Sequence, residues 1–333
     1  MDGLNGVKDI MLAKFNAFIE KWMALVTPCC LLIGVLFPEI TGKGVPLVPV
    51  MFGIMTFIGA LKSRFVDIAG VFKRPGPLLL CLLALHVVMP AAASLCGHLF
   101  FAGNADLITG MILEFVVPGA VVGLMWVSIY NGSSPLSLSL VILDTLLAPF
   151  IIPLSLKVLV GSSVTLDVAG MMTELIFMIA LPAVAAMTVN QISCGKTMTT
   201  WPKKLAPLSK LCLIFVVSCN ASKVAPFIRH MNMQRLEVAL CILLLAAAGY
   251  VLGWLMARLT RQDDAVTVSM IYGSGMRNIS AGAVIAAAYF PGEVMFPVMI
   301  GTLFQQILAA VFGSLYQRQS RRRQAVPAIK TQK

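Results

Sequence analysis

The sequence predicts an all-α integral membrane protein with ten transmembrane helices, and three observations support this fold class. Of the 333 residues, 59% are hydrophobic and only 12% are charged, whereas soluble domains have about 25% charged residues. Apolar runs of about 20 residues, the length that crosses a bilayer as a helix, follow one another along the chain. The connections between them are short, so no linker separates a second, soluble domain.

The chain divides into three predicted parts. Residues 1–20 resemble a short amphipathic lead-in helix, residues 21–316 form a single membrane domain, and residues 317–333 form a basic tail. The predicted spanning segments are 21–38, 45–62, 76–101, 105–130, 135–160, 166–191, 207–228, 233–257, 264–290 and 293–316.

The distribution of basic residues supports this number of helices. With both termini in the cytoplasm, 19 of the 25 lysines and arginines fall on the inside and four on the outside. This bias is typical of proteins of the cell (inner or plasma) membrane and predicts that both termini are cytoplasmic. An eight- or nine-helix chain would lose the bias.

Several function classes are excluded by composition. The net charge of +11 comes mostly from residues that flank apolar segments or lie in the tail, so nucleic-acid binding is not expected. The cysteines and the three histidines show no spacing typical of a metal site, and no cofactor motif or P-loop is present. No nucleophile stands near a base in the sequence, so we do not expect an enzyme.

Two spanning segments carry interruptions at matching positions. Pro118 and Gly119 interrupt segment 105–130, and the stretch "GSGMRN" from Gly273 to Asn278 interrupts segment 264–290. Each is the fourth of five segments, which indicates two repeats, 21–160 and 166–316. Because five is an odd number, the second repeat crosses the membrane in the opposite sense to the first. Paired broken helices of this kind indicate a transporter's binding site. A proline kink that only eases packing is the alternative for Pro118 taken alone.

A helix broken inside a membrane exposes backbone groups that suit a charged ligand. The N-terminus of each half-helix carries free N–H groups and a partial positive charge, which favour an anion. The second interruption also carries Gly275, Arg277 and Asn278. The breaks are therefore predicted to form a binding centre for an anion.

Five stretches of the chain resemble the bile acid:sodium symporter (BASS) family, namely "HVVMP", "PGAVVGL", "YNGSSPLSLSL", "LLAPFIIPL" and "SGMRNISAGAVIAAAYF". The resemblance covers nearly the whole chain. It implies ten helices in two inverted five-helix repeats, interleaved panel and core subdomains, and helices four and nine that are unwound and cross at mid-membrane. It also implies sodium-coupled uptake of organic anions such as bile acids and other carboxylates.

The sequence departs from this family at the positions that the resemblance assigns to sodium ligands. These positions are Gly123, Leu124, Ser137, Val141, Gly273 and Arg277, with Leu85 next to His86 at a further position in the third helix. Only Ser137 keeps a side-chain oxygen, and a guanidinium repels a cation. Neither family sodium site is therefore expected to be intact, and sodium is left open as a coupling ion.

A buried arginine needs polar partners, because it costs about 3 kcal/mol at the centre of a membrane helix. Asp144 or Glu114 is the predicted partner of Arg277 in the absence of substrate. Two interpretations stay open. Either Arg277 holds a permanent ion pair in the place of the cation, or it binds a substrate carboxylate in bidentate fashion. In the second case Asp144 or Glu114 would carry a coupling proton.

Other polar residues complete the candidate site. The substrate-binding candidates are Arg277, Asn278, Gly119, Ser137, Asn220 and Gln306. Gln305 and Gln306 are adjacent, so one of them is expected to point away from the cavity, and Gln306 is favoured as the one that faces it. His86 is interpreted as a packing histidine with a backbone acceptor.

The favoured function is secondary transport of a small organic anion by alternating access, sodium-independent or proton-linked. An ordinary sodium-coupled symporter of bile acids or organic anions, or a membrane sensor that binds an anion without transporting it, are the alternatives. The expected partners are the anion and membrane lipid, and the sequence is compatible with a monomer.

Overall fold

The computed structural model describes residues 22–66, 75–160, 167–193 and 195–330. The predicted lead-in over residues 1–20 lies outside these described residues. Within them every regular element is a helix.

The first half of the described chain contains α2 (Met23–Leu36), α3 (Pro38–Thr41), η1 (Gly42–Leu47), α4 (Val48–Ala60), α6 (Pro75–Leu83), η3 (Ala84–Val88), α7 (Met89–Phe100), α8 (Ala105–Val116), α9 (Gly123–Ile129) and α10 (Ser134–Val160). The second half contains α11 (Val168–Leu175), η5 (Ile176–Ala180), α12 (Leu181–Ile192), α13 (Lys196–Arg229), α14 (Met233–Leu259), α15 (Asp264–Gly275), α16 (Ile279–Tyr289), η6 (Gly292–Val294) and α17 (Met295–Lys330).

Seven helices of the described chain are long and apolar enough to cross a membrane. They correspond to seven of the predicted segments. The other three predicted segments do not contain a single helix of that length. The described part of α2 has 14 residues, and segments 105–130 and 264–290 are each split into two short helices. An all-α membrane protein with two broken helices is thus confirmed at this level.

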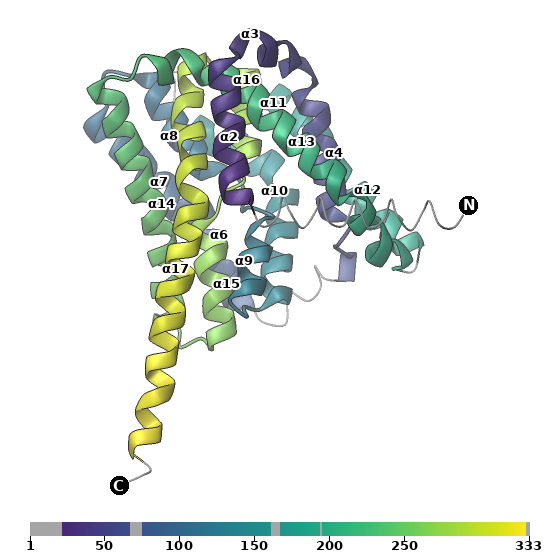
Figure 1. The fold of residues 1–333 in the computed structure, drawn as a ribbon, viewed down its shortest axis with the longest axis vertical. Helices are drawn as coiled ribbons and strands as arrows, with labels where there is room; N and C mark the ends of the chain where they lie inside the picture. Colours follow the sequence, from purple (N-terminus) through teal and green to yellow (C-terminus); the bar gives the residue numbers. More distant parts are fainter. Residues whose placement is uncertain (1–21, 67–74, 161–166, 194, 331–333) are drawn as a thin grey trace.

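The helices form two groups (Figure 1). In the first group α13 packs against α2 and α4, and α4 also contacts α12. In the second group α8 packs against α7, α10 and α17, while α14 packs against α15 and α17. Both broken pairs, α8–α9 and α15–α16, belong to the second group or to its border with the first.

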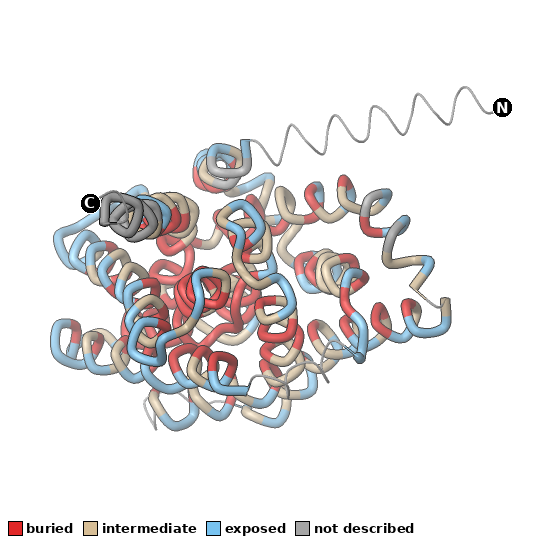
Figure 2. Tube along the Cα trace, turned by 90° about the horizontal axis from the view of Figure 1, so that it is seen from below, coloured by how far each residue is buried: buried red, intermediate tan, exposed pale blue. Residues whose placement is uncertain are grey.

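Burial follows the pattern expected of a protein in lipid. Figure 2 shows the buried segments gathered in the middle of the molecule and exposed ones around them. The outer face of α14 carries apolar side chains at helical spacing, all exposed: Leu236, Leu240, Leu244, Val251, Leu255 and Leu259. A stripe of this length fits contact with hydrocarbon rather than with water.

The last helix is longer than predicted. The sequence places its end at residue 316, but α17 continues as a helix to Lys330 and runs away from the rest of the molecule in Figure 1. Part of the reason is a tertiary contact, because Tyr316 Oη and Ser320 Oγ donate hydrogen bonds to the Asp264 carboxylate at 2.6 and 2.8 Å. These bonds hold the helix one turn beyond the predicted end.

Candidate functional site

The two helix breaks meet each other. Gly119 and Arg277 form an isolated antiparallel bridge, and the Asn278 N–H donates to the Pro118 carbonyl at 2.7 Å. A break inside a membrane protein leaves backbone groups without partners, and pairing the two breaks satisfies some of them. The sequence prediction that the two interruptions face each other agrees with this geometry.

Local sequence explains where the half-helices begin and end. Val117 precedes a proline and takes an extended conformation, with ψ of 151°, which ends α8. Asn278 begins α16 by accepting a hydrogen bond from the Ala281 N–H at 3.2 Å, as an N-cap residue does. Asp263 caps α15 in the same way through the Val266 N–H at 2.8 Å.

Gly273 and Gly275 were predicted to lie in the second break, and this placement is wrong. α15 continues through Gly275, and only residues 276–278 separate it from α16. The glycines are needed for close packing instead. A Cβ on Gly273 would lie 2.6 Å from Leu140 Cδ2, and a Cβ on Gly275 would overlap the ring of Tyr250.

Arg277 is buried at the crossing and turns back onto α15. Its side chain is 3% exposed, its Nη1 donates to the Ser274 carbonyl at 2.9 Å, and its guanidinium lies 5.9 Å from the Phe115 ring centroid. Its backbone N–H donates to Gln305 Oε1 at 3.0 Å. The cation thus sits at the C-terminal end of a half-helix, where the helix dipole is negative. Its Nε and Nη2 have no hydrogen-bond partner among the described residues.

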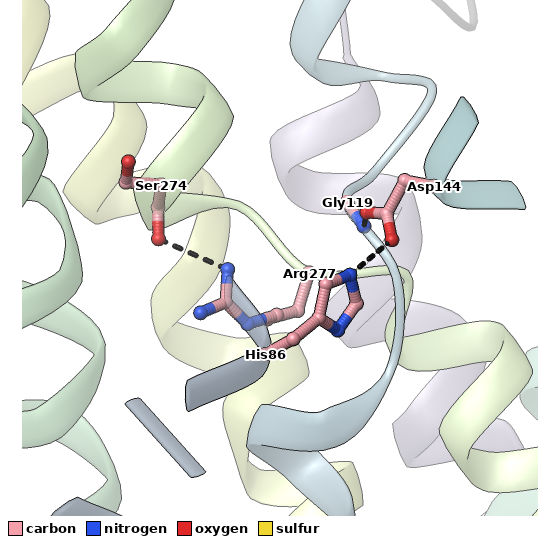
Figure 3. A network of polar contacts seen from close by, with 5 residues as sticks. All are labelled: His86, Gly119, Asp144, Ser274 and Arg277. Carbon is pink, nitrogen blue, oxygen red and sulfur yellow. Dashed lines mark hydrogen bonds and ion pairs between the residues drawn. The ribbon is translucent and has the colours of Figure 1, made fainter. Parts of the chain in front are cut away.

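Asp144 does not pair directly with Arg277 in the described structure, contrary to the sequence prediction. Its Oδ1 lies 2.6 Å from His86 Nε2, and its Oδ2 accepts from the Gly119 N–H at 2.6 Å (Figure 3). Each carboxylate oxygen therefore already has one polar partner. Arg277 interacts with Asp144 only through the Coulomb field.

His86 reaches Asp144 because the third helix contains a π-helical turn, η3, over Ala84–Val88. The interpretation of His86 as a packing histidine with a backbone acceptor is wrong. Leu85, the position that the resemblance favoured, is fully buried among apolar residues. A π turn inserts an extra residue into the helix and rotates its faces, which spacing alone does not reveal.

Glu114 is also not paired with Arg277. It is 3% exposed, its carboxyl group packs against Gly301 on α17, and its Oε2 has no hydrogen-bond partner in the described residues. Because glycine has no side chain, position 301 leaves the space that this carboxyl group occupies. Glu114 and Arg277 interact through the Coulomb field without a hydrogen bond.

A cavity of about 700 Å³ lies against the crossing, between the two helix groups. Residues of α4, α12 and α13 line one side, and residues of α9, α10, α16 and α17 line the other. Its charged lining side chains are Lys62, Lys210 and Arg277, and no acidic side chain in the described part of the chain lines it. The cavity extends from Arg277 to Lys62 and Ser63, just beyond the end of α4. It is therefore suited to an anion with an apolar body.

The predicted site residues divide into two sets. The cavity is lined by Arg277, Asn278, Asn220, Gln306, Pro118, Leu124 and Val141. Other predicted positions lie outside the lining: Gly119, Gly123, Ser137, Gly273, Gly275, Glu114 and Asp144. Asn220 is fully buried, and neither of its amide atoms has a hydrogen-bond partner among the described residues. Such an amide is free to bind a ligand or water.

Both glutamines of the last helix line the cavity, so the expectation that one points elsewhere is wrong. Gln306 Oε1 accepts from Trp126 Nε1 at 2.9 Å, and Gln305 holds the backbone of Arg277. Adjacent residues of a helix diverge by about 100°, and the width of the cavity accommodates both. Gln305, which the sequence disfavoured, therefore joins the site, and so do Lys62 and Lys210, which sequence reasoning did not identify as site residues.

The positions that the family resemblance assigns to sodium ligands carry few side-chain oxygens in this chain. Of the six residues only Ser137 offers a side-chain oxygen, and its buried hydroxyl has no hydrogen-bond partner within the described structure. The Gly273 position is filled by Leu140, and Arg277 places a positive charge at the crossing. A sodium ion needs several oxygen ligands, which these side chains do not supply.

Comparison with known proteins places the chain in a transporter family. Residues 48–231 match the model of the sodium bile acid symporter family. YbaS of Bacillus subtilis is 40% identical over 89% of this chain and 97% of its own length. The sodium-dependent transporter YocS of the same organism is 21% identical over 95% of the chain and 97% of its own length, and the probable chloroplastic sodium/metabolite cotransporter BASS3 of rice is 24% identical over 80% and 63%. With its apolar helices, the chain is a multi-pass membrane transporter rather than an enzyme, and it belongs to the sodium bile acid symporter family.

Proposed function

We propose that this protein is a secondary transporter of small organic anions, that Arg277 receives the substrate carboxylate, and that transport does not depend on sodium. The observation that carries the proposal is the charge of the cavity, which is lined by three basic side chains and by no acidic one in the described residues. The apolar remainder of the lining suits the body of an organic acid.

The free hydrogen-bond donors of Arg277 support its role. Nε and Nη2 are buried and unpartnered, while Nη1 is held by Ser274. A carboxylate that accepts from these two nitrogens would form a bidentate pair. Buried donors without partners cost free energy, so an anion that satisfies them gains affinity. Asn278 and Asn220 add amide groups to the same cavity.

Alternating access follows from the position of the cavity between two helix groups. We assign α2, α4, α12 and α13 to a panel and the helices around the crossing to a core, and rocking of one against the other moves the site between the two sides. The repeats, 21–160 and 166–316, supply one broken helix each. The cavity ends beside Lys62 and Lys210, on the side that the positive-inside bias makes cytoplasmic, so this conformation faces inward.

Counterflow in proteoliposomes tests the proposal. Vesicles loaded with unlabelled pyruvate, pantoate or cholate are given the matching labelled anion, in choline and in sodium buffers. Exchange with at least one anion at equal rate in the two buffers is expected. Strict sodium dependence would instead indicate an ordinary sodium-coupled symporter. Binding without exchange, measured by thermal shift, would indicate a sensor.

Arg277→Gln tests the proposed receptor residue. It is expected to lower the affinity for the exchanged anion by at least tenfold, since a charged hydrogen-bonding partner is lost. Arg258→Gln, an exposed residue near the end of α14 that does not line the cavity, is the matched control and should bind as the native protein does. Equal affinities in all three proteins would exclude Arg277 as the receptor.

A further inference from the structure

His86 and Asp144 form a buried acid–base pair next to the helix crossing. The imidazole Nε2 lies 2.6 Å from Asp144 Oδ1, and the two side chains are 9% and 0% exposed. Oδ2 of Asp144 accepts from the Gly119 N–H, and when the carboxylate is ionised its Oδ1 can only accept, so that Nε2 is then the ring nitrogen that donates. Nδ1 is buried and has no hydrogen-bond partner in the described residues. Its lone pair is therefore the place at which a further proton can add.

The pair is connected to the break itself (Figure 3). Asp144 holds the backbone of Gly119, and Gly119 pairs with Arg277 across the crossing. Arg277 also lies within the Coulomb field of Asp144. A change in the charge of the pair therefore changes its electrostatic interaction with Arg277, the residue that we propose to bind the substrate.

The charged and titratable groups around the pair come from five elements. Asp144 on α10, Glu114 on α8 and Tyr250 on α14 interact electrostatically with Arg277, which lies between α15 and α16, and His86 on η3 joins this group through its contact with Asp144. Among them Arg277 is the fixed cation. A bound monocarboxylate adds one negative charge to this buried group, and an uncompensated buried charge is costly. One proton taken up with the anion removes that imbalance.

We propose that His86 takes up this proton, so that the protein carries one proton with each monocarboxylate and transport is electroneutral. The inference rests on the proposed carboxylate transport. The proton adds to Nδ1, and the imidazolium then holds the Asp144 carboxylate in a charge-assisted pair. Asp144 attracts Arg277 less, and the guanidinium is left to the substrate. By linkage, anion binding must favour protonation of His86 to the same extent.

The structure favours His86 over Glu114 for this role. Glu114 packs against Gly301 and makes no hydrogen bond to either break within the described residues. His86 acts on the break through Asp144 and Gly119. Asp144 and Glu114, which the sequence alone left equivalent, thus differ in their connection to the break, and His86 shares that of Asp144.

Gradient-driven uptake tests the assignment. Proteoliposomes in choline buffer receive labelled pyruvate, pantoate or cholate with a pH difference of one unit, acidic outside. A one-to-one symporter should concentrate the transported anion about tenfold, since one pH unit corresponds to a tenfold ratio at equilibrium. A potential set by potassium and valinomycin should leave the native accumulation unchanged, because no net charge moves.

His86→Gln is expected to lose the accumulation driven by pH, and the exchange that remains should become sensitive to the potential. Asp144→Asn should lose the accumulation as well. His98→Gln is the matched control, because His98 is an exposed histidine of α7 that hydrogen-bonds to Ser94 one turn earlier. It should accumulate the anion as the native protein does.

Three results would overturn the inference. Native counterflow without pH-driven accumulation would refute proton coupling and leave the proposed transport standing. Accumulation that survives His86→Gln but is lost in Glu114→Gln would assign the proton to Glu114. No counterflow with any of the three anions would refute the proposed transport and the inference together.

Discussion

Replacing Gly275 with alanine should destabilise the protein, because the end of α15 lies directly against Tyr250. An added Cβ would stand 2.5 and 2.7 Å from the two Cδ atoms of the ring, about 1 Å inside normal carbon–carbon contact. The ring cannot retreat easily. It is fully buried, it stacks on Phe312 with centroids 5.0 Å apart, and its hydroxyl donates to the Gln305 carbonyl at 3.3 Å.

Overpacking of this kind costs about 1–3 kcal/mol. For a chain of this size we expect Tm to fall by about 2–10 °C, measured by tryptophan fluorescence of the purified protein in detergent. Gly103→Ala is the control, because a Cβ at Gly103 meets nothing within 4 Å. Tyr250→Leu should reduce the cost of the Gly275 change, as a double-mutant cycle would show. An unchanged Tm in Gly275→Ala would refute the packing argument.

Three further substitutions test the crossing and its surroundings. Asn278→Ala should cost about 1 kcal/mol in unfolding free energy through loss of the α16 N-cap, while Asn278→Ser should retain most of it in the same denaturation assay. Trp126→Phe leaves the Gln306 Oε1 without its donor and should lower the unfolding free energy by about 1–3 kcal/mol, whereas an additional Gln306→Leu should recover part of the loss. Gly273→Glu should still give uptake independent of sodium, because Ser137 is the one other of the six assigned positions with a side-chain oxygen; sodium-stimulated uptake in this variant would contradict that reasoning.

The sequence alone predicted much of the fold because that information is local. Apolar run length marks where a helix can cross a membrane, and a proline or a polar stretch marks where it breaks. Pro118 and Arg277 were located in this way, and the structure places the two breaks in contact. The expectation that the family's sodium ligands are missing also needs only the residue types. The exact extent of the second break was misjudged, since glycines inside α15 serve helix packing.

The partners across the site required tertiary structure. Spacing along one helix says which residues share a face, but not how far a neighbouring helix is rotated or where it lies along its axis. The π turn at Ala84–Val88 rotates His86 toward Asp144, and no periodicity in the sequence signals this. Glu114 likewise lies against Gly301 rather than Arg277 because a glycine 187 positions away leaves room there. The sequence determined that charges lie at the crossing, and only the packing of the helices decided which of them meet.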